Sequence, residues 1–378
     1  DDAYRIKANN REYYSSGIQA VFNVLAGDHD IQAGLRIHSD EMDRFQWEDR
    51  YGMQSGQLVM TTQATKGSDS NRIDSAEATA LFVEDRFTTG AMTITAGARY
   101  EEITVKRDDW GKTDPDRSEI PSKREHTIDV VVPGIGIEYA INESQTVSVG
   151  IHKGFAPPGP GTSGVTDKAV DPETSMNTEI GFKSNKGLNS LEFTLFMNSY
   201  DNLLGADTAA SGGGSDDLFN GGAVDISGFE LYLRRILVDN GRIQMPLELA
   251  WTNTNSEFQE SFDGFWGDVS KGDELPYLPD TMIALNLGLN VDKISANISM
   301  KKTSEMRTVA GSGSISSSNA TDELTIIDLG LRYALQDNIR LSVGINNFMD
   351  DDGVVSRRPY GARPTMPRSF SLGVDYTF

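Results

Sequence analysis

The last nine residues of the chain constrain its fold more than any other segment. Apolar and polar residues alternate strictly there, with Phe370, Leu372, Val374, Tyr376 and Phe378 as the apolar members. Such alternation predicts a β-strand, and in a soluble protein a terminal aromatic strand would be an exposed, aggregation-prone edge. In an outer-membrane barrel the strand pairs with the first strand and its apolar face meets lipid. The pattern favours a transmembrane barrel over a soluble sandwich, and we assign these five residues as an outer-membrane assembly signal.

Composition excludes several other classes of protein. No apolar run approaches the roughly 20 residues that a spanning helix needs, so a helical membrane protein is excluded. The mean hydropathy of -0.40 is compatible with spanning strands, which are apolar on one face only. The absence of Cys excludes disulfide frameworks and thiolate metal sites. A net charge of -22, from 56 acidic and 34 basic residues, argues against a nucleic-acid partner.

One unit recurs along the chain: two alternating segments joined by a short turn, followed by a long polar connection. Short turns are expected at residues 27–29, 88–90, 142–144, 186–189, 239–241, 291–293 and 336–338. Long connections are expected at residues 46–71, 107–124, 156–172, 204–222, 256–274, 308–323 and 350–366. Short turns at one end and long loops at the other are typical of outer-membrane barrels, where the turns are periplasmic and the loops extracellular.

Counting these pairs and the final strand predicts about fifteen strands of the length that a bilayer demands. Ionisable residues and Gly fall on the predicted lumen side, as Arg340 does opposite Ile339 and Leu341, so a wide, wet interior is expected. Bacterial single-chain barrels have even strand numbers, and an odd count therefore predicts that part of the barrel is missing. We expect the first strand near residues 16–25 and assign residues 1–14 to the remnant of an extracellular loop.

Five local motifs occur in a fixed order: VGIHKGFAPP at residues 149–158, DPETSMNTEIGF at 171–182, GFE at 228–230, VGINNFMD at 343–350 and PRSFSLGVDYTF at 367–378. Together they resemble the sequences of TonB-dependent outer-membrane receptors. Within that family, residues 154–161, 202–207 and 219–222 look most like the ferric-dicitrate receptor branch. The order and spacing of these motifs extend the resemblance over essentially the whole chain.

The resemblance implies a barrel of about 22 strands closed around an N-terminal plug, of which about 15 strands are present and the plug is absent. Residues 1–378 then form one partial barrel domain, with hairpins over residues 15–378. It implies active uptake of a ferric chelate, ferric citrate or another siderophore, in the outer membrane of a Gram-negative bacterium. The implied partners are outer-membrane lipid, lipopolysaccharide, the ferric chelate, and the TonB inner-membrane energy complex through the missing N-terminal part.

Two alternatives remain open on the sequence: TonB-dependent uptake of a non-iron substrate such as an oligosaccharide or cobalamin, and a passive porin or adhesin. We expect no enzyme activity, because no metal-binding His pair, nucleophile motif or phosphate loop is present. No cofactor is expected, since the substrate's chelator saturates the iron.

Three arginines in the last long loop, Arg357, Arg358 and Arg363, are the candidate ligand-binding residues. Their forked donors suit the carboxylates of an anionic chelate. The alternative interpretation of this cluster is ordinary loop electrostatics. Arg99, Arg332 and Arg340 occupy lumen-facing positions and are expected to pair with carboxylates of the barrel or the plug.

Overall fold

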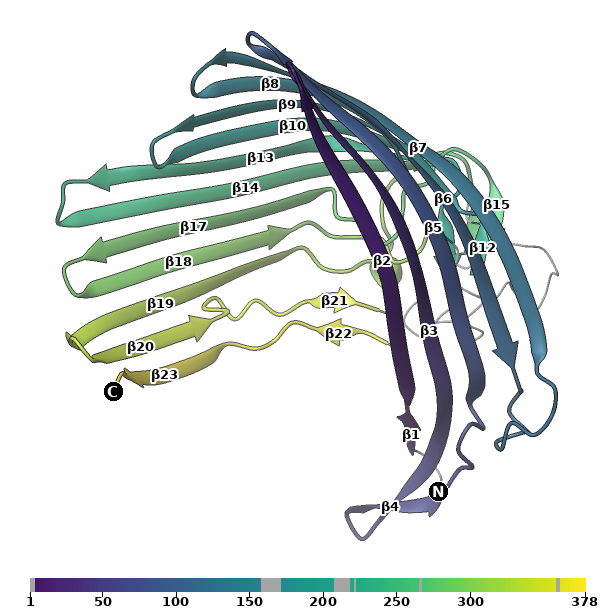
Figure 1. Ribbon diagram of the computed structural model, residues 1–378. Helices are drawn as coiled ribbons and strands as arrows, with labels where there is room; N and C mark the ends of the chain where they lie inside the picture. The colour runs from purple at the N-terminus through teal and green to yellow at the C-terminus, as the bar shows by residue number, and fades with distance from the viewer. Residues whose placement is uncertain (1–3, 158–170, 207–217, 221, 265–266, 358–360) are drawn as a thin grey trace.

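The computed structural model describes residues 4–157, 171–206, 218–220, 222–264, 267–357 and 361–378, and these ranges form an all-β structure. One 17-stranded antiparallel sheet dominates, and it curves continuously from β2 to β23 (Figure 1). Its long strands are β2 (Arg11–Ala26), β3 (His29–Gln54), β5 (Ser70–Thr89), β6 (Met92–Asp109), β7 (Ser122–Asn142), β8 (Gln145–Ala156), β9 (Glu173–Lys186), β10 (Asn189–Tyr200), β13 (Val224–Asp239), β14 (Ile243–Phe258), β17 (Thr281–Val291), β18 (Ile294–Thr303), β19 (Leu324–Gln336), β20 (Ile339–Asn346) and β23 (Ser369–Tyr376).

The remaining elements are short. Strands β1 (Tyr4–Ala8) and β4 (Gln57–Thr62) pair with the far half of β3 and complete the large sheet. Three hairpins are formed by β11 (Leu204–Ala206) with β12 (Leu218–Asn220), β15 (Phe262–Gly264) with β16 (Gly267–Val269), and β21 (Val354–Ser356) with β22 (Arg363–Pro364). A 3-10 turn covers Ser317–Asn319. No helix in the described part of the chain is long and apolar enough to cross a membrane.

The predicted all-β architecture is confirmed: setting aside β1 and β4, fifteen strands of the described sheet follow one another as antiparallel neighbours. Within the described residues β2 pairs only with β3 along its length, and β23 pairs only with β20. The two lie at opposite margins of the curved sheet in Figure 1. The sheet is therefore open, as expected from an odd number of strands.

The faces of the sheet follow from its register. Pairing between β2, β3, β5, β6 and β7 is one-to-one without a bulge, so each alternate residue keeps the same face over the whole strand. One face carries an exposed apolar band that includes Leu35, Leu81, Val83, Val131 and Ile135. In β23, Leu372 and Val374 are 86% and 70% exposed. These side chains form no dry core, and this face is the outer, lipid-facing one; the opposite face lines the lumen.

Several strand limits differ from the sequence prediction. β3 continues to Gln54 and β7 begins at Ser122, so parts of the expected loops 46–71 and 107–124 are strand. Residues 1–14 were expected to be a loop remnant, but Tyr4–Ala8 form β1 and β2 already begins at Arg11. Beyond the bilayer the outer face needs no apolar residues, so the alternation disappears while backbone pairing continues. The extracellular placement of these extensions stays a prediction.

Candidate anion-binding site

Five arginines occupy neighbouring strands at the loop-side end of the lumen-facing surface. We call Arg11, Arg44, Arg72, Arg107 and Arg124 the inner-face arginine cluster. Arg44 stands directly opposite Arg11 on one side and Arg72 on the other, and Arg107 stands opposite Arg124. The unbroken alternation places all five on the face opposite the exposed apolar band.

Such an arrangement is unfavourable by itself. Like charges directly opposite each other across a sheet are destabilising. Among the described residues, the register places Asp74 opposite Arg107 and Asp109 opposite Arg72, and these carboxylates offset part of the repulsion. In a chain with 56 acidic and 34 basic residues, five guanidinium groups gathered on neighbouring strands favour an anionic partner.

Hydrogen bonds fix the orientation of three of these arginines. Asp74 accepts from Arg107 Nε at 2.6 Å and from Arg72 Nε at 3.2 Å. Arg44 Nε donates to Gln46 Oε1 at 3.1 Å, and Gln46 in turn donates to Asn9. Because each guanidinium is held through its Nε, its plane is fixed before any ligand arrives.

Burial strengthens the field of the cluster. Arg44 is 7% exposed, and the side chains of Arg72 and Arg107 are 12% and 11% exposed. The two outer members of the cluster differ. Arg124 is exposed, whereas the Nε of Arg11 is buried and has no hydrogen-bond partner in the described part of the chain. Charge-assisted bonds to an anion are stronger where water is scarce.

An apolar layer lies directly below the arginines on the same face. Ala78, Ile103, Val105 and Ile128 form a buried cluster, and Ala76 and Phe155 pack against it. This layer keeps water away from the floor of the arginine cluster and holds β5, β6 and β7 in a fixed arrangement.

The motif at residues 149–182 has a packing role on the same wall. Gly154 faces Ser175 across β8 and β9, and a Cβ at Gly154 would lie 2.6 Å from the Ser175 hydroxyl and 3.0 Å from the Asn177 amide. Ser175 and Asn177 are buried and hydrogen-bonded to each other at 3.0 Å. Glycine at this position therefore makes room for the polar pair.

The predicted loop arginines have a different environment. Arg357 Nε donates to the Ala320 carbonyl at 2.6 Å, and its Nη2 donates to the Ser317 carbonyl at 2.8 Å. Arg363 is exposed on β22 and pairs across the β21–β22 hairpin with Ser356, the residue that precedes Arg357. Arg358 lies outside the described residues. The ligand contact of these arginines stays a prediction, but the Arg357 guanidinium already braces two loops against each other.

A cavity of about 340 Å³ between the β14–β17 and β18–β19 loops is acidic rather than basic. Its Arg307 donates to Glu274 Oε2 at 2.7 Å and to the Gly313 carbonyl at 3.0 Å. Partial burial and the nearby Glu274 carboxylate raise the pKa of Asp280, and the Arg307 charge opposes that shift. This loop cavity does not suit an anionic ligand.

Other lumen-facing predictions can be placed. Arg99 pairs with Glu101 and lies 5.6 Å from the centre of the Phe82 ring, as expected for an arginine that pairs with a barrel carboxylate. His38 and His152 lie on the inner face, opposite Gly17 and Gly134. Within the described ranges no group of three or more His, Asp or Glu side chains is arranged to hold a metal ion.

The sequence reasoning missed the whole inner-face arginine cluster. Arg107 and Arg124 lie at the ends of a segment that was expected to be a loop, and Arg11 lies in the expected loop remnant. Arg44 and Arg72 just flank the expected loop 46–71. Their common face depends on strand extension and register, which no local pattern in the sequence reveals.

Comparison with known proteins agrees with the barrel fold. A family model described as TonB dependent receptor-like, beta-barrel, matches residues 2–348. No curated protein sequence matches significantly. Among solved structures, the siderophore receptor PiuA from Acinetobacter baumannii has a TM-score of 0.76 at 15% identity, over 98% of this chain and 56% of that chain.

Two further solved structures have similar folds and are of transporters described for different substrates. The unliganded ferric citrate transporter FecA has a TM-score of 0.76 at 19% identity, over 98% of this chain and 55% of that chain. The copper transporter OprC has a TM-score of 0.69 at 17% identity, over 98% of this chain and 57% of that chain. The chain thus spans little more than half the length of the structures that it matches, and at these identities the likeness establishes the fold alone.

Proposed function

Since the chain belongs to the TonB-dependent receptor family through its β-barrel, we propose that the whole protein takes up an anionic ferric chelate across the outer membrane of a Gram-negative bacterium. Ferric citrate is the first ligand to test, and another anionic siderophore is the next. The TonB energy complex, outer-membrane lipid and lipopolysaccharide are the proposed partners. The proteins of this family are receptors and transporters rather than enzymes, and we propose no catalytic role.

The inner-face arginine cluster is the observation that supports an anionic substrate. Carboxylate-bearing chelates offer paired oxygens that match the fork of a guanidinium group. Five guanidinium groups on one face, the fixed planes of three of them, and the Nε of Arg11, which has no partner among the described residues, all favour such a ligand.

Binding of ferric dicitrate to the full-length receptor tests this proposal. Arg11→Gln with Arg124→Gln removes the two less buried arginines and leaves the Asp74 network intact. Each charge-assisted contact contributes roughly 1.5–3 kcal/mol, so the double variant should bind about a hundredfold more weakly or worse. Titration calorimetry at moderate ionic strength measures the change.

Two comparisons make the result decisive. Arg242→Gln removes an exposed arginine that pairs with Asp292 at a turn on the opposite end of the barrel, and it should change affinity less than twofold. Arg357→Ala with Arg363→Ala tests the sequence-predicted loop site in parallel. If a neutral ferric hydroxamate binds as tightly as ferric dicitrate, and the Arg11 and Arg124 variant binds both normally, the anionic substrate class is rejected.

A further inference from the structure

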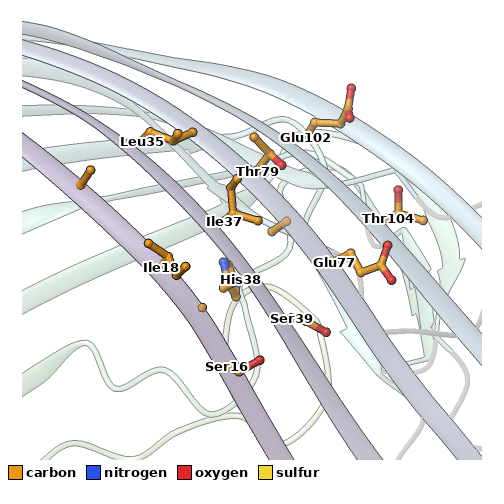
Figure 2. A pocket seen from close by; sticks show the side chains of 13 residues that line it. Ser16, Ile18, Leu35, Ile37, His38, Ser39, Glu77, Thr79, Glu102 and Thr104 are labelled. Carbon is orange, nitrogen blue, oxygen red and sulfur yellow. The ribbon is translucent and has the colours of Figure 1, made fainter.

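A second site lies on the outer face, where no chelate would reach. A groove of about 770 Å³ is lined mainly by outward residues of β2, β3, β5 and β6, and the inward-facing Gly17, His38 and Ala78 also border it (Figure 2). Residues that pair directly across these four strands form successive rows within the groove. The lowest row contains Ala20 and Leu35, which are paired with each other and continue the lipid-facing apolar band.

The polarity of the outer face changes within the groove. The middle row runs across the four strands as Ile18, Ile37, Thr79 and Glu102. The next row toward the loop end consists of Ser16, Ser39, Glu77 and Thr104. Apolar side chains thus give way to hydroxyls and carboxylates over two rows. Such a change marks the border of the hydrocarbon layer, and the groove extends across that border.

The side chains at the loop end of the groove determine which kind of lipid head group fits there. These side chains are carboxylates and hydroxyls, which accept hydrogen bonds, and neither Arg nor Lys is among the described residues that line the groove. Lys106, just outside, lies 3.2 Å from Glu77 and is paired with it. A phosphate head group would be repelled by Glu102, whereas the hydroxyls of a neutral sugar can donate to both carboxylates.

We propose that this groove binds a membrane glycolipid, with its sugar between Glu77, Glu102 and Thr104 and an acyl chain along Ile18, Leu35 and Ile37. Continuity with the lipid-facing band identifies the occupant as a lipid, and the acceptor-rich upper part identifies its head as a hydroxyl donor. Thr79 and Glu102 lie on β5 and β6, away from the free edge of β2, so a strand pairing with that edge would leave them accessible. This site depends on the transmembrane fold and is independent of the chelate proposal.

Native mass spectrometry of the full-length receptor can test the proposal. The receptor is released from nanodiscs that contain equal amounts of monoglucosyl diacylglycerol and phosphatidylglycerol with identical acyl chains. The wild type should retain the glucosyl lipid about tenfold more than phosphatidylglycerol. Glu102→Lys should abolish or reverse that preference, because it removes an acceptor and adds a cation.

The matched control is Glu125→Lys, which makes the same charge change at an exposed outer-face position opposite Lys106 and outside the groove. It should leave the preference unchanged. Thr104→Val, a smaller change, should lower glucosyl-lipid retention about threefold and serves if Glu102→Lys does not fold. Equal retention of both lipids by the wild type, a preference for phosphatidylglycerol, or an equal effect of Glu125→Lys would overturn the proposal.

Discussion

At the scale of single residues, Arg117 shows how one side chain fixes a loop. It follows β6, and its guanidinium donates to both carboxylate oxygens of Asp43, at 2.8 and 2.5 Å. The same group stacks between Trp110 and Phe45, with ring centres 4.7 and 5.3 Å away. The hydrogen bonds to Asp43, with the charge of that carboxylate, raise the pKa of Arg117. Arg117 therefore connects residues 110–121 to β3, and the bond from the Asn71 amide to the Asp114 carbonyl connects them to β5.

We expect Arg117→Lys to release this loop. Lysine keeps the charge but loses the forked hydrogen bonds and the stacking, which together contribute about 1.5–2 kcal/mol. Hydrogen exchange of the amides in residues 110–121 should become about 10- to 30-fold faster. Lys123→Ala, which removes an exposed pair with Asp108 at 3.6 Å, should change these rates less than twofold. Equal rates in the two variants would contradict the assignment.

Asp114 makes the stability of the same loop depend on pH. Its carboxylate accepts from the Glu119 and Ser118 amides, at 3.0 and 3.1 Å, and from the Ser118 hydroxyl. These bonds, with that of Glu119 first, lower the pKa of Asp114 below its ordinary 3.8. Because the shift is downward, the stabilisation is fully present above the ordinary pKa and is lost as the pH falls through the lowered one.

Loop amides in the wild type should therefore keep constant protection from pH 7 to 5, after correction for intrinsic exchange, and lose it only under strongly acidic conditions. Asp114→Asn should have lower protection across the range and a weaker acid transition. Hydrogen exchange at a series of pH values measures both curves. Parallel curves with the same acid transition would remove Asp114 as the cause.

At the scale of elements, strand packing depends on glycines at close contacts. Gly228 on β13 stands opposite Thr254, and a Cβ there would collide with the Asn253 carbonyl and lie 2.9 Å from the Phe196 ring. Gly136 on β7 has room instead, since the nearest atom to an added Cβ is the Val149 carbonyl oxygen at 3.8 Å. The two positions are both strand glycines but differ in the space around them.

Gly228→Ala should consequently destabilise the barrel by about 2–3 kcal/mol, because backbone cannot move aside as a side chain can. Gly136→Ala should be nearly neutral. Heat-modifiable migration of the full-length protein on gels, followed across a temperature series, reports the folded fraction. Similar melting of the two variants would show that β13 and β14 tolerate the extra methyl group.

The closing strand β23 carries its apolar residues on the exposed face, with Phe370 and Leu372 opposite Ile345 and Val343 of β20. The Tyr376 and Phe378 rings contact each other edge to face, with centres 4.9 Å apart. These features are consistent with insertion into lipid. The role of this strand as an assembly signal stays a prediction.

At the scale of the whole molecule, the two free edges are the main unsatisfied feature. An unpaired edge cannot face lipid, because its backbone groups would have no hydrogen-bond partners. We therefore expect the full-length protein to pair both β2 and β23 with further strands. Hydrogen exchange in nanodiscs should show β2 and β23 amides as protected as those of β10, which is paired on both sides. Fast exchange along either strand would contradict closure.

The sequence by itself determined the strands, their faces and the alternation of short turns with long loops. Lipid outside and water inside impose period-two alternation on each spanning segment, so residues such as Ile339 and Leu341 reveal their own orientation. The tight turns could be predicted too, because each depends on only a few adjacent residues. The predicted fifteen strands agree with the described sheet for this reason.

Only the tertiary structure decided where the charges meet. Arg44 and Arg72 become neighbours through the register of β3 and β5, and Arg107 and Arg124 through that of β6 and β7. Above the bilayer both faces of a strand are polar, so the sequence loses the signal that separates strand from loop. Arg357, conversely, stands out in the sequence but donates to loop carbonyls that only folding brings within reach. A charge cluster on a sheet is a property of register, and register is set by pairing between distant segments.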